Sequence, residues 1–104
     1  MRVISKSGLA AFWVKNPDSR EPLKTWLEEV SSAIWLTPAD VKAHFRSSSI
    51  LQKGRVVFNI AGNKYRLVVA VLYNTQIVLI KFIGTHEAYN RVDAQTVDFK
   101  QGGK

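Results

Sequence analysis

Residues 57–68 read VFNIAGNKYRLV, in which a short apolar run, a polar turn and a second apolar run follow one another. Gly62-Asn63 at the centre is typical of a two-residue hairpin turn, because glycine accepts the positive φ that such a turn requires. This turn fixes the pairing on both sides, so that Asn59 faces Arg66 and Phe58 faces Leu67. The stretch therefore predicts an antiparallel β-hairpin.

A second turn, Asn74-Thr75, predicts a third antiparallel strand. Counting outward from this turn, Val68 is expected to face Lys81 and Leu67 to face Phe82. Side chains alternate between the two faces of a strand, so this register sorts them. The predicted core face consists of Val56, Phe58, Ile60, Tyr65, Leu67, Val69, Val71, Val78, Ile80 and Phe82. The predicted outer face carries Arg55, Asn59, Lys64, Arg66 and Lys81, with Val57, Val68, Ala70 and Leu79 between them.

Amphipathic helices precede these strands. Ser5 or Ser7 is expected to cap the first, whose apolar residues Leu9, Phe12 and Trp13 share one side. Asn16-Pro17 ends it, because the residue before proline is driven out of the helical region. Asp18 or Ser19 is expected to cap the second helix. Its apolar stripe consists of Leu23, Trp26, Leu27, Val30 and Ile34.

A third helix is predicted from Thr37-Pro38-Ala39-Asp40 to about Phe45, because a capping Thr, a first-turn Pro and an acid at the third position start helices. A serine-rich loop is expected over residues 47–49, and Arg2-Val3-Ile4 is expected to be an edge strand. Together these elements predict an α+β fold in which N-terminal helices pack on one face of a small, mostly antiparallel sheet.

Positive charge is concentrated between Asp40 and Glu87, where no carboxylate occurs. The cations of this segment are Lys42, Arg46, Lys53, Arg55, Lys64, Arg66 and Lys81. The remaining residues hold eight basic and eight acidic side chains, so the whole net charge of +7 belongs to this segment. This positive charge must be balanced by solvent ions, by an acidic partner or by a polyanion, and nucleic acid is the commonest polyanion in a cell.

The chain of 104 residues is expected to form one domain, with a flexible tail from about residue 95 and a frayed Gly102-Gly103-Lys104. It contains no cysteine, which excludes disulfides and thiolate metal sites. The sequence shows no metal-ligand cluster and no cofactor motif. Its longest apolar runs are too short to span a bilayer and no signal peptide precedes them, so we expect a cytoplasmic protein without a membrane partner.

The outer face carries residues suited to cleaving RNA without a metal. That reaction needs a proton removed from the 2′-hydroxyl, a proton given to the 5′-oxygen, and stabilisation of the charged phosphorane. Arg66 and Lys64 suit the last task, because cations grip phosphate oxygens. His86 suits proton transfer, and a short helix capped by Thr85 would place His86 and Tyr89 on one side. Tyr89 or Lys64 could serve as the other proton carrier, but only with a depressed pKa.

Each of these residues also has a structural interpretation, which stays open. Arg66 and Lys64 could belong to an ordinary solvated face of the sheet. His86 could cap or pack against the end of a strand, and Tyr89 could lie at the edge of the core. His44, beside Phe45, is interpreted as structural.

The hairpin stretch, together with FIGTHEAYN at residues 82–90, resembles the HigB toxin family of type II toxin–antitoxin modules. TPADVK at residues 37–42 and FRSSSI at residues 45–50 extend the likeness, which covers nearly the whole chain. The family belongs to the RelE/ParE superfamily. The resemblance therefore implies a RelE-like α+β domain and a ribosome-dependent mRNA endonuclease.

The resemblance also implies site residues and partners. Lys64, Arg66, His86 and Tyr89 are the expected catalytic residues, and the expected RNA-binding residues are Arg46, Lys53, Arg55, Asn59 and Lys81. The expected partners are a helix-turn-helix antitoxin (HigA-like), the ribosome and mRNA, with DNA reached only through the antitoxin. Two alternatives stay open: a toxin of the same fold that binds a protein such as gyrase, and a non-catalytic RNA- or ribosome-binding module. The convergence of His86 and Tyr89 on the cationic face favours the nuclease.

Overall fold

A five-stranded sheet with the order β1-β5-β4-β3-β2 forms the centre of the protein. The computed structural model describes residues 1–98, so the predicted fraying of Gly102-Gly103-Lys104 lies outside the described residues. The strands are β1 (Arg2–Ile4), β2 (Ser49–Ile50), β3 (Arg55–Ile60), β4 (Tyr65–Leu72) and β5 (Ile77–Thr85). β1 runs parallel to β5, and the other pairs are antiparallel. The predicted edge strand and mostly antiparallel sheet are confirmed.

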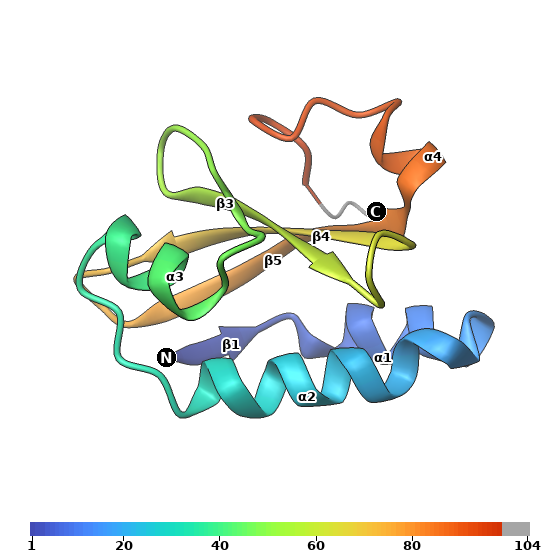
Figure 1. The fold of residues 1–104 in the computed structure, drawn as a ribbon, viewed down its shortest axis with the longest axis horizontal. Helices are drawn as coiled ribbons and strands as arrows, with labels where there is room; N and C mark the ends of the chain where they lie inside the picture. The colour runs from blue at the N-terminus through green and yellow to red at the C-terminus, as the bar shows by residue number, and fades with distance from the viewer. Residues whose placement is uncertain (99–104) are drawn as a thin grey trace.

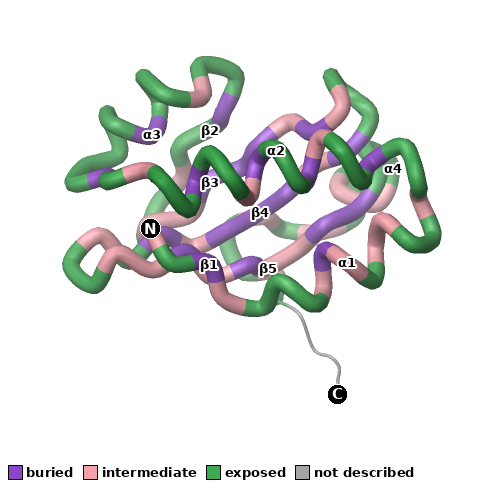
Figure 2. The backbone as a smooth tube through the Cα atoms, turned by 90° about the horizontal axis from the view of Figure 1, so that it is seen from below, coloured by how far each residue is buried: buried purple, intermediate pink, exposed green. Residues whose placement is uncertain are grey.

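Two long helices cover one face of this sheet (Figures 1 and 2). They are α1 (Lys6–Lys15) and α2 (Arg20–Ser31), joined by the short 3₁₀ helix η1 (Pro17–Ser19). The other helices are α3 (Pro38–His44) and α4 (His86–Tyr89). α4 and the segment that follows it lie on the opposite side of the sheet from α1 and α2 (Figure 1). The α+β class is therefore confirmed, although not every helix precedes the sheet.

β4 is the central strand, and both of its faces are covered. Leu67 and Val69 on the helix side and Val68 on the outer side are all fully buried. Val57, the outer-face neighbour of Val68 on β3, is buried as well. The segment of residues 90–98 lies over this outer face (Figure 1), so the middle of the predicted cationic face is closed to solvent.

A β-bulge between Val68 and Val69 corrects the predicted register of the second hairpin. On the turn side of the bulge the predicted pairing holds, and Val69 faces Ile80. On the other side Val68 faces Phe82 instead of Lys81, and Leu67 faces Ile83 instead of Phe82. A shift of one residue moves each side chain to the opposite face. Ile83 consequently joins the core, and Phe82 lies on the outer face instead of the predicted core face.

Three local predictions were wrong. α2 ends at Ser31, so Ile34 lies beyond the helix, where 77% of its surface is exposed. Ser49, which was expected to be part of the serine-rich loop, instead begins β2, and this strand pairs with β3. No side chain caps α2, because the Ser19 hydroxyl instead donates a hydrogen bond to the carbonyl of Asn16 at 2.7 Å.

The capping box of α3 is confirmed. The amide of Asp40 donates to the Thr37 hydroxyl at 3.4 Å, and the Asp40 carboxylate accepts from the amide of Thr37 at 3.1 Å. The same carboxylate also accepts from the amide of Leu36 at 2.8 Å, so it holds the chain just before the helix. No helix within residues 1–98 is both long and apolar enough to cross a membrane.

Two glycines with positive φ provide a matched test of the sheet. Gly54 (φ +76°) lies against β4, where an added Cβ would stand 2.7 Å from the carbonyl oxygen of Val71. Gly62 (φ +68°) is in the hairpin turn with no atom within 4 Å of that position. Gly62→Ala should lose about 1–2 kcal/mol of unfolding free energy through the left-handed backbone alone. Gly54→Ala should lose about 1–3 kcal/mol more, because backbone atoms must separate. Urea denaturation measures both, and equal losses would contradict the close approach of Gly54 to β4.

Candidate nucleic-acid site

Arg66 stands on the outer face near the start of β4, between Asn59 of β3 and Gly84 of β5. Its Nη1 donates hydrogen bonds to the carbonyls of Asn63 at 3.0 Å and Tyr65 at 3.3 Å. These bonds hold the guanidinium at the end of the sheet. Within residues 1–98, Nε and Nη2 make no hydrogen bond, so three of its N–H donors are available to phosphate oxygens.

α4 brings His86 and Tyr89 to the same end of the sheet. The amide of His86 donates to the carbonyl of Lys64 at 3.1 Å, which ties the start of α4 to the residue before β4. The Thr85 hydroxyl accepts from the amide of Ala88 at 3.1 Å, as the predicted cap requires. His86 is exposed and Tyr89 is half-buried, three positions apart on a single helical turn. The short helix and its capping residue are thus confirmed.

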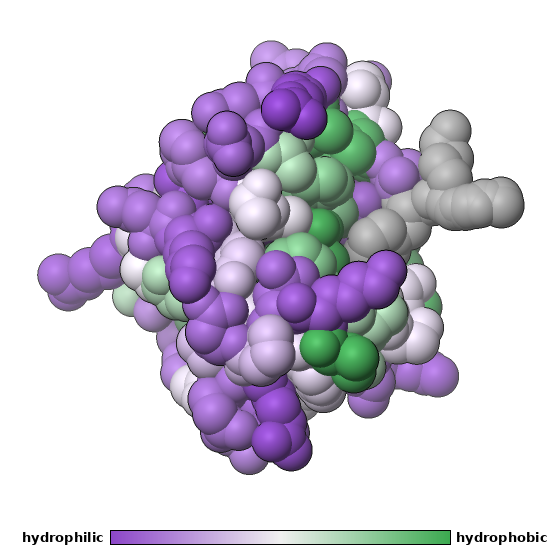
Figure 3. Space-filling model, turned by 90° about the vertical axis from the view of Figure 1, so that its right-hand side faces the viewer, coloured by the Kyte–Doolittle hydropathy of each residue, from purple (hydrophilic) through white to green (hydrophobic). Residues whose placement is uncertain are grey.

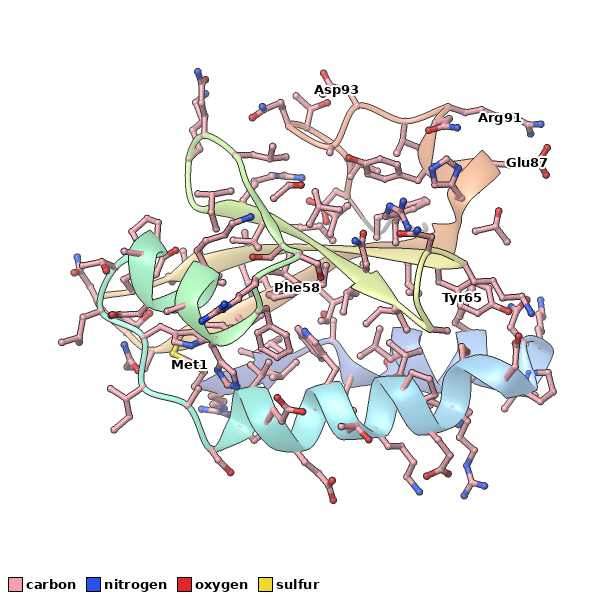
Figure 4. All side chains as sticks on the ribbon, in the orientation of Figure 1. Met1, Phe58, Tyr65, Glu87, Arg91 and Asp93 are labelled. Atoms are coloured by element: carbon pink, nitrogen blue, oxygen red, sulfur yellow. The ribbon has the colours of Figure 1, made fainter. Side chains whose placement is uncertain are left out.

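Figure 3 views this end of the molecule, the right-hand side of Figure 1. Hydrophilic side chains make up most of the surface and surround a narrow strip of apolar atoms. In Figure 4, Phe58 and Tyr65 lie on the helix side of the sheet, whereas Glu87 and Arg91 lie at its outer side near α4. At this end of the molecule, the core therefore lies on the helix side of the sheet, and polar and cationic side chains lie on the outer side.

Lys64 has a carboxylate partner that the sequence did not indicate. Asp18, in η1, forms an ion pair with the Lys64 ammonium and accepts a hydrogen bond from the Tyr65 hydroxyl at 2.5 Å. The hydrogen bond with Asp18 raises the pKa of Lys64 above its ordinary value of 10.5. This shift is opposite in direction to the depressed pKa that proton transfer by Lys64 would require. No spacing pattern marks this contact, because Asp18 lies 46 residues before Lys64.

Phe82 adds an aromatic ring to the outer face that the predicted register had placed in the core. Its ring extends over Gly84, where an added Cβ would stand only 2.6 Å from the ring edge. Gly84 is in turn the cross-strand neighbour of Arg66, so a half-buried ring lies beside the cation. An aromatic ring next to a phosphate-binding cation is suited to stacking on an unpaired base.

The other predicted RNA-binding residues do not form one surface. Asn59 lies directly beside Arg66, whereas Lys53 lies in the turn before β3, beyond the opposite end of that strand. Arg55 is used within the chain, since its Nη1 donates to the carbonyls of Ala94 at 3.3 Å and Val97 at 2.5 Å. Lys81 forms an ion pair with Asp98 at 3.2 Å.

Within residues 95–98, the Val97 carbonyl contacts Arg55 and the Asp98 carboxylate contacts Lys81. The flexibility of the tail from about residue 95 stays a prediction. One expectation from the sequence is corrected: solvent and partners are not the only groups that neutralise the cations, because Asp18 and Asp98 reach them from the flanking segments. Within residues 1–98, the side chains of Arg46 and Lys53 have no ion-pair or hydrogen-bond partner and are exposed.

Residues 19–92 match the family described as HigB toxin, the RelE-like toxic component of a toxin-antitoxin system. The matched range begins just before α2 and ends after α4, so it contains every predicted site residue. No curated protein gives a significant match to the chain. Within residues 1–98, no group of three or more histidine, cysteine, aspartate or glutamate side chains is arranged to hold a metal ion.

The Asp18 contacts predict a pH-dependent contribution to stability. Hydrogen bonds from Lys64 and then from Tyr65 lower the pKa of Asp18 below its ordinary value of 3.8. A group with a lowered folded-state pKa stabilises the fold above its unfolded value and loses that contribution as the pH falls through the folded value. Asp18→Asn should therefore melt at a lower temperature than the wild type near neutral pH, and the two melting temperatures should converge below about pH 3.8.

Tyr65→Phe serves as the second arm of this experiment, because it removes one of the two hydrogen bonds and keeps the ion pair. In the Tyr65→Phe background, Asp18→Asn should lower the melting temperature by less than it does in the wild type. A gap between Asp18→Asn and the wild type that is independent of pH would show that the ion pair contributes nothing.

Proposed function

Because this chain belongs to the HigB toxin family of RelE-like toxic components of toxin–antitoxin systems, we propose that it is a ribosome-dependent endoribonuclease that cuts translated mRNA. The observation that carries this proposal is the junction of β4 and α4. There the backbone bond between His86 and Lys64 joins an exposed imidazole to the strand that carries Arg66. This bond supports the proposal, because it ties a side chain suited to proton transfer to a strand that carries a cation suited to binding phosphate.

In this proposal Arg66 binds the scissile phosphate through its free Nε and Nη2 donors. Two bonds to backbone carbonyls hold the guanidinium in place, so little side-chain freedom is lost when RNA binds. Lys64 adds a second positive charge that stabilises the crowded phosphorane. RNA phosphate would compete with the Asp18 carboxylate for this ammonium.

Proton transfer falls to His86 and Tyr89 on α4. His86 is exposed, and histidine is the residue type most often used for proton transfer in catalysis. Tyr89 follows one helical turn later and offers a phenol on the same side. One residue would take the proton from the 2′-hydroxyl and the other would protonate the leaving 5′-oxygen.

The ribosome supplies the remaining contacts in this proposal. Arg46 and Lys53 are exposed cations outside the junction of β4 and α4, and they suit ribosomal RNA phosphates. The family implies an antitoxin partner, and we propose that it carries a helix-turn-helix domain through which the pair reaches DNA. A toxin that binds a protein target such as gyrase is the main rival. It would leave message intact, so primer extension on a translated mRNA separates the two.

Arg66→Ala should reduce single-turnover cleavage of ribosome-bound message by about 10²–10³-fold, because a stabilising charge on the phosphorane is lost. Arg20→Ala is the matched control. It removes the same charge from an exposed site on the helix layer and should cleave normally. Circular dichroism confirms the fold of both variants. If Arg66→Ala cleaves at the wild-type rate, Arg66 is only a surface residue and the proposed site is wrong.

His86→Gln keeps hydrogen-bonding capacity but cannot carry a proton near neutral pH. Single-turnover cleavage should fall by about 10²–10⁴-fold while ribosome affinity changes little. A purely structural His86 would instead lower the melting temperature and leave cleavage by the folded fraction normal. Tyr89→Phe provides the parallel measurement on α4. Wild-type rates for both variants would exclude these residues from proton transfer, and the family assignment would be unaffected.

A further inference from the structure

An open groove lies between the C-terminal end of α2 and α3, at the end of the molecule opposite α4 (Figure 1). Its volume is about 920 Å³. Ile34 and Leu36 line it, with 77% and 69% of their surfaces exposed. Large apolar side chains that stand this far out of a surface cost free energy in water, and neighbouring ones on a groove mark interaction sites.

The backbone that carries these two side chains is held in place. Trp35, between them, is buried, and its indole Nε1 donates to His44 Nδ1 at 3.3 Å. The Trp35 carbonyl accepts from Gln76 Nε2 at 2.7 Å, and the Leu36 amide donates to the Asp40 carboxylate at 2.8 Å. With Trp35 anchored inward, Ile34 and Leu36 on either side are presented to solvent in a fixed arrangement. A partner would therefore lose little free energy in ordering this surface.

The charge of the groove is opposite to that of the molecule. Glu28, Glu29 and Asp40 line it, and no lysine or arginine does, although the chain carries a net charge of +7. Asp40 is occupied by the α3 capping box, and Glu29 bonds to His44 Nε2 at 3.2 Å. Within residues 1–98, the Glu28 carboxylate has no partner. This surface repels RNA and attracts a cationic one.

We propose that this groove is the docking surface for the antitoxin. Its occupant is a segment of the antitoxin in which apolar side chains cover Ile34 and Leu36 and flanking lysine or arginine side chains meet Glu28 and Glu29. The apolar contacts supply affinity, and the charge complementarity supplies orientation and a fast association rate. The proposal depends on membership of the toxin–antitoxin family and not on the nuclease chemistry.

The experiment compares the double variant Ile34→Asp/Leu36→Asp with Val14→Asp. Val14 is 74% exposed on α1, outside the groove, and is therefore a matched apolar-to-acid control. The probe is the purified antitoxin from the reading frame beside the toxin gene, with affinity measured by calorimetry. The double variant should bind at least 10²-fold more weakly, as expected when apolar contacts at the centre of an interface are lost. Val14→Asp should bind normally.

A second arm tests the charge without touching the apolar residues. Glu28→Lys should weaken antitoxin binding about tenfold at low salt, and the difference should shrink as salt is raised. Glu21→Lys makes the same reversal at the other end of α2 and should have little effect. Thermal melting identifies any variant that is unfolded. If the double variant is unfolded, the Glu28→Lys measurement decides whether the groove binds the antitoxin.

Cell growth gives a readout that separates this proposal from the nuclease proposal. The double variant should still arrest growth and should no longer be rescued by antitoxin expression. Unchanged antitoxin affinity in the folded double variant overturns the docking proposal and leaves the nuclease proposal intact. The proposal is also overturned if the wild-type protein forms a dimer in the absence of antitoxin and the double variant is a monomer. The occupant of the groove is then a second copy of this chain.

Discussion

The pairing of β4 with a strand on each side is the constraint on which the rest of the structure depends. Its central residues are fully buried on both faces, with the helices on one side and the C-terminal segment on the other. A charged side chain in the middle of this strand would have no access to water. The cation of the candidate site, Arg66, accordingly lies near the beginning of the strand. There it faces Gly84 on the neighbouring strand, and α4 begins two residues after Gly84.

The sequence predicted those parts of the fold that local signals determine. The Gly62 turn fixed the register of the first hairpin, and the capping residues Thr37 and Thr85 marked helix starts correctly. The bulge was not predictable, because the run around Lys81 fits the alternation of a strand in either register. The site was predicted in part: its backbone arrangement followed from the hairpins. The contacts of Asp18 and Phe82 depend on residues that meet only in the folded protein.

The fold brings together charged residues that are far apart in the sequence. In the sequence the cationic segment has no acid of its own, but carboxylates from the flanking segments reach Lys64 and Lys81. Backbone carbonyls accept hydrogen bonds from one nitrogen of the Arg55 guanidinium and one nitrogen of the Arg66 guanidinium. What remains is a polar end with an available guanidinium edge, and an acidic, apolar groove at the other end. The two ends of this small domain therefore differ in the charge that they offer to a partner.

The parallel pairing of β1 with β5 has a consequence for how the protein is made. Within residues 1–98, β1 comes before every other element in the chain, yet its sheet neighbour is the last strand, since Arg2 pairs with Ile77. Closing so long a loop is entropically costly and slow compared with forming the β3–β4–β5 hairpins. The sheet cannot be complete until the ribosome has synthesised β5. A nascent chain released before residue 77 would lack β5 and α4, so β1 would have no strand to pair with and β4 would keep only β3 as a neighbour.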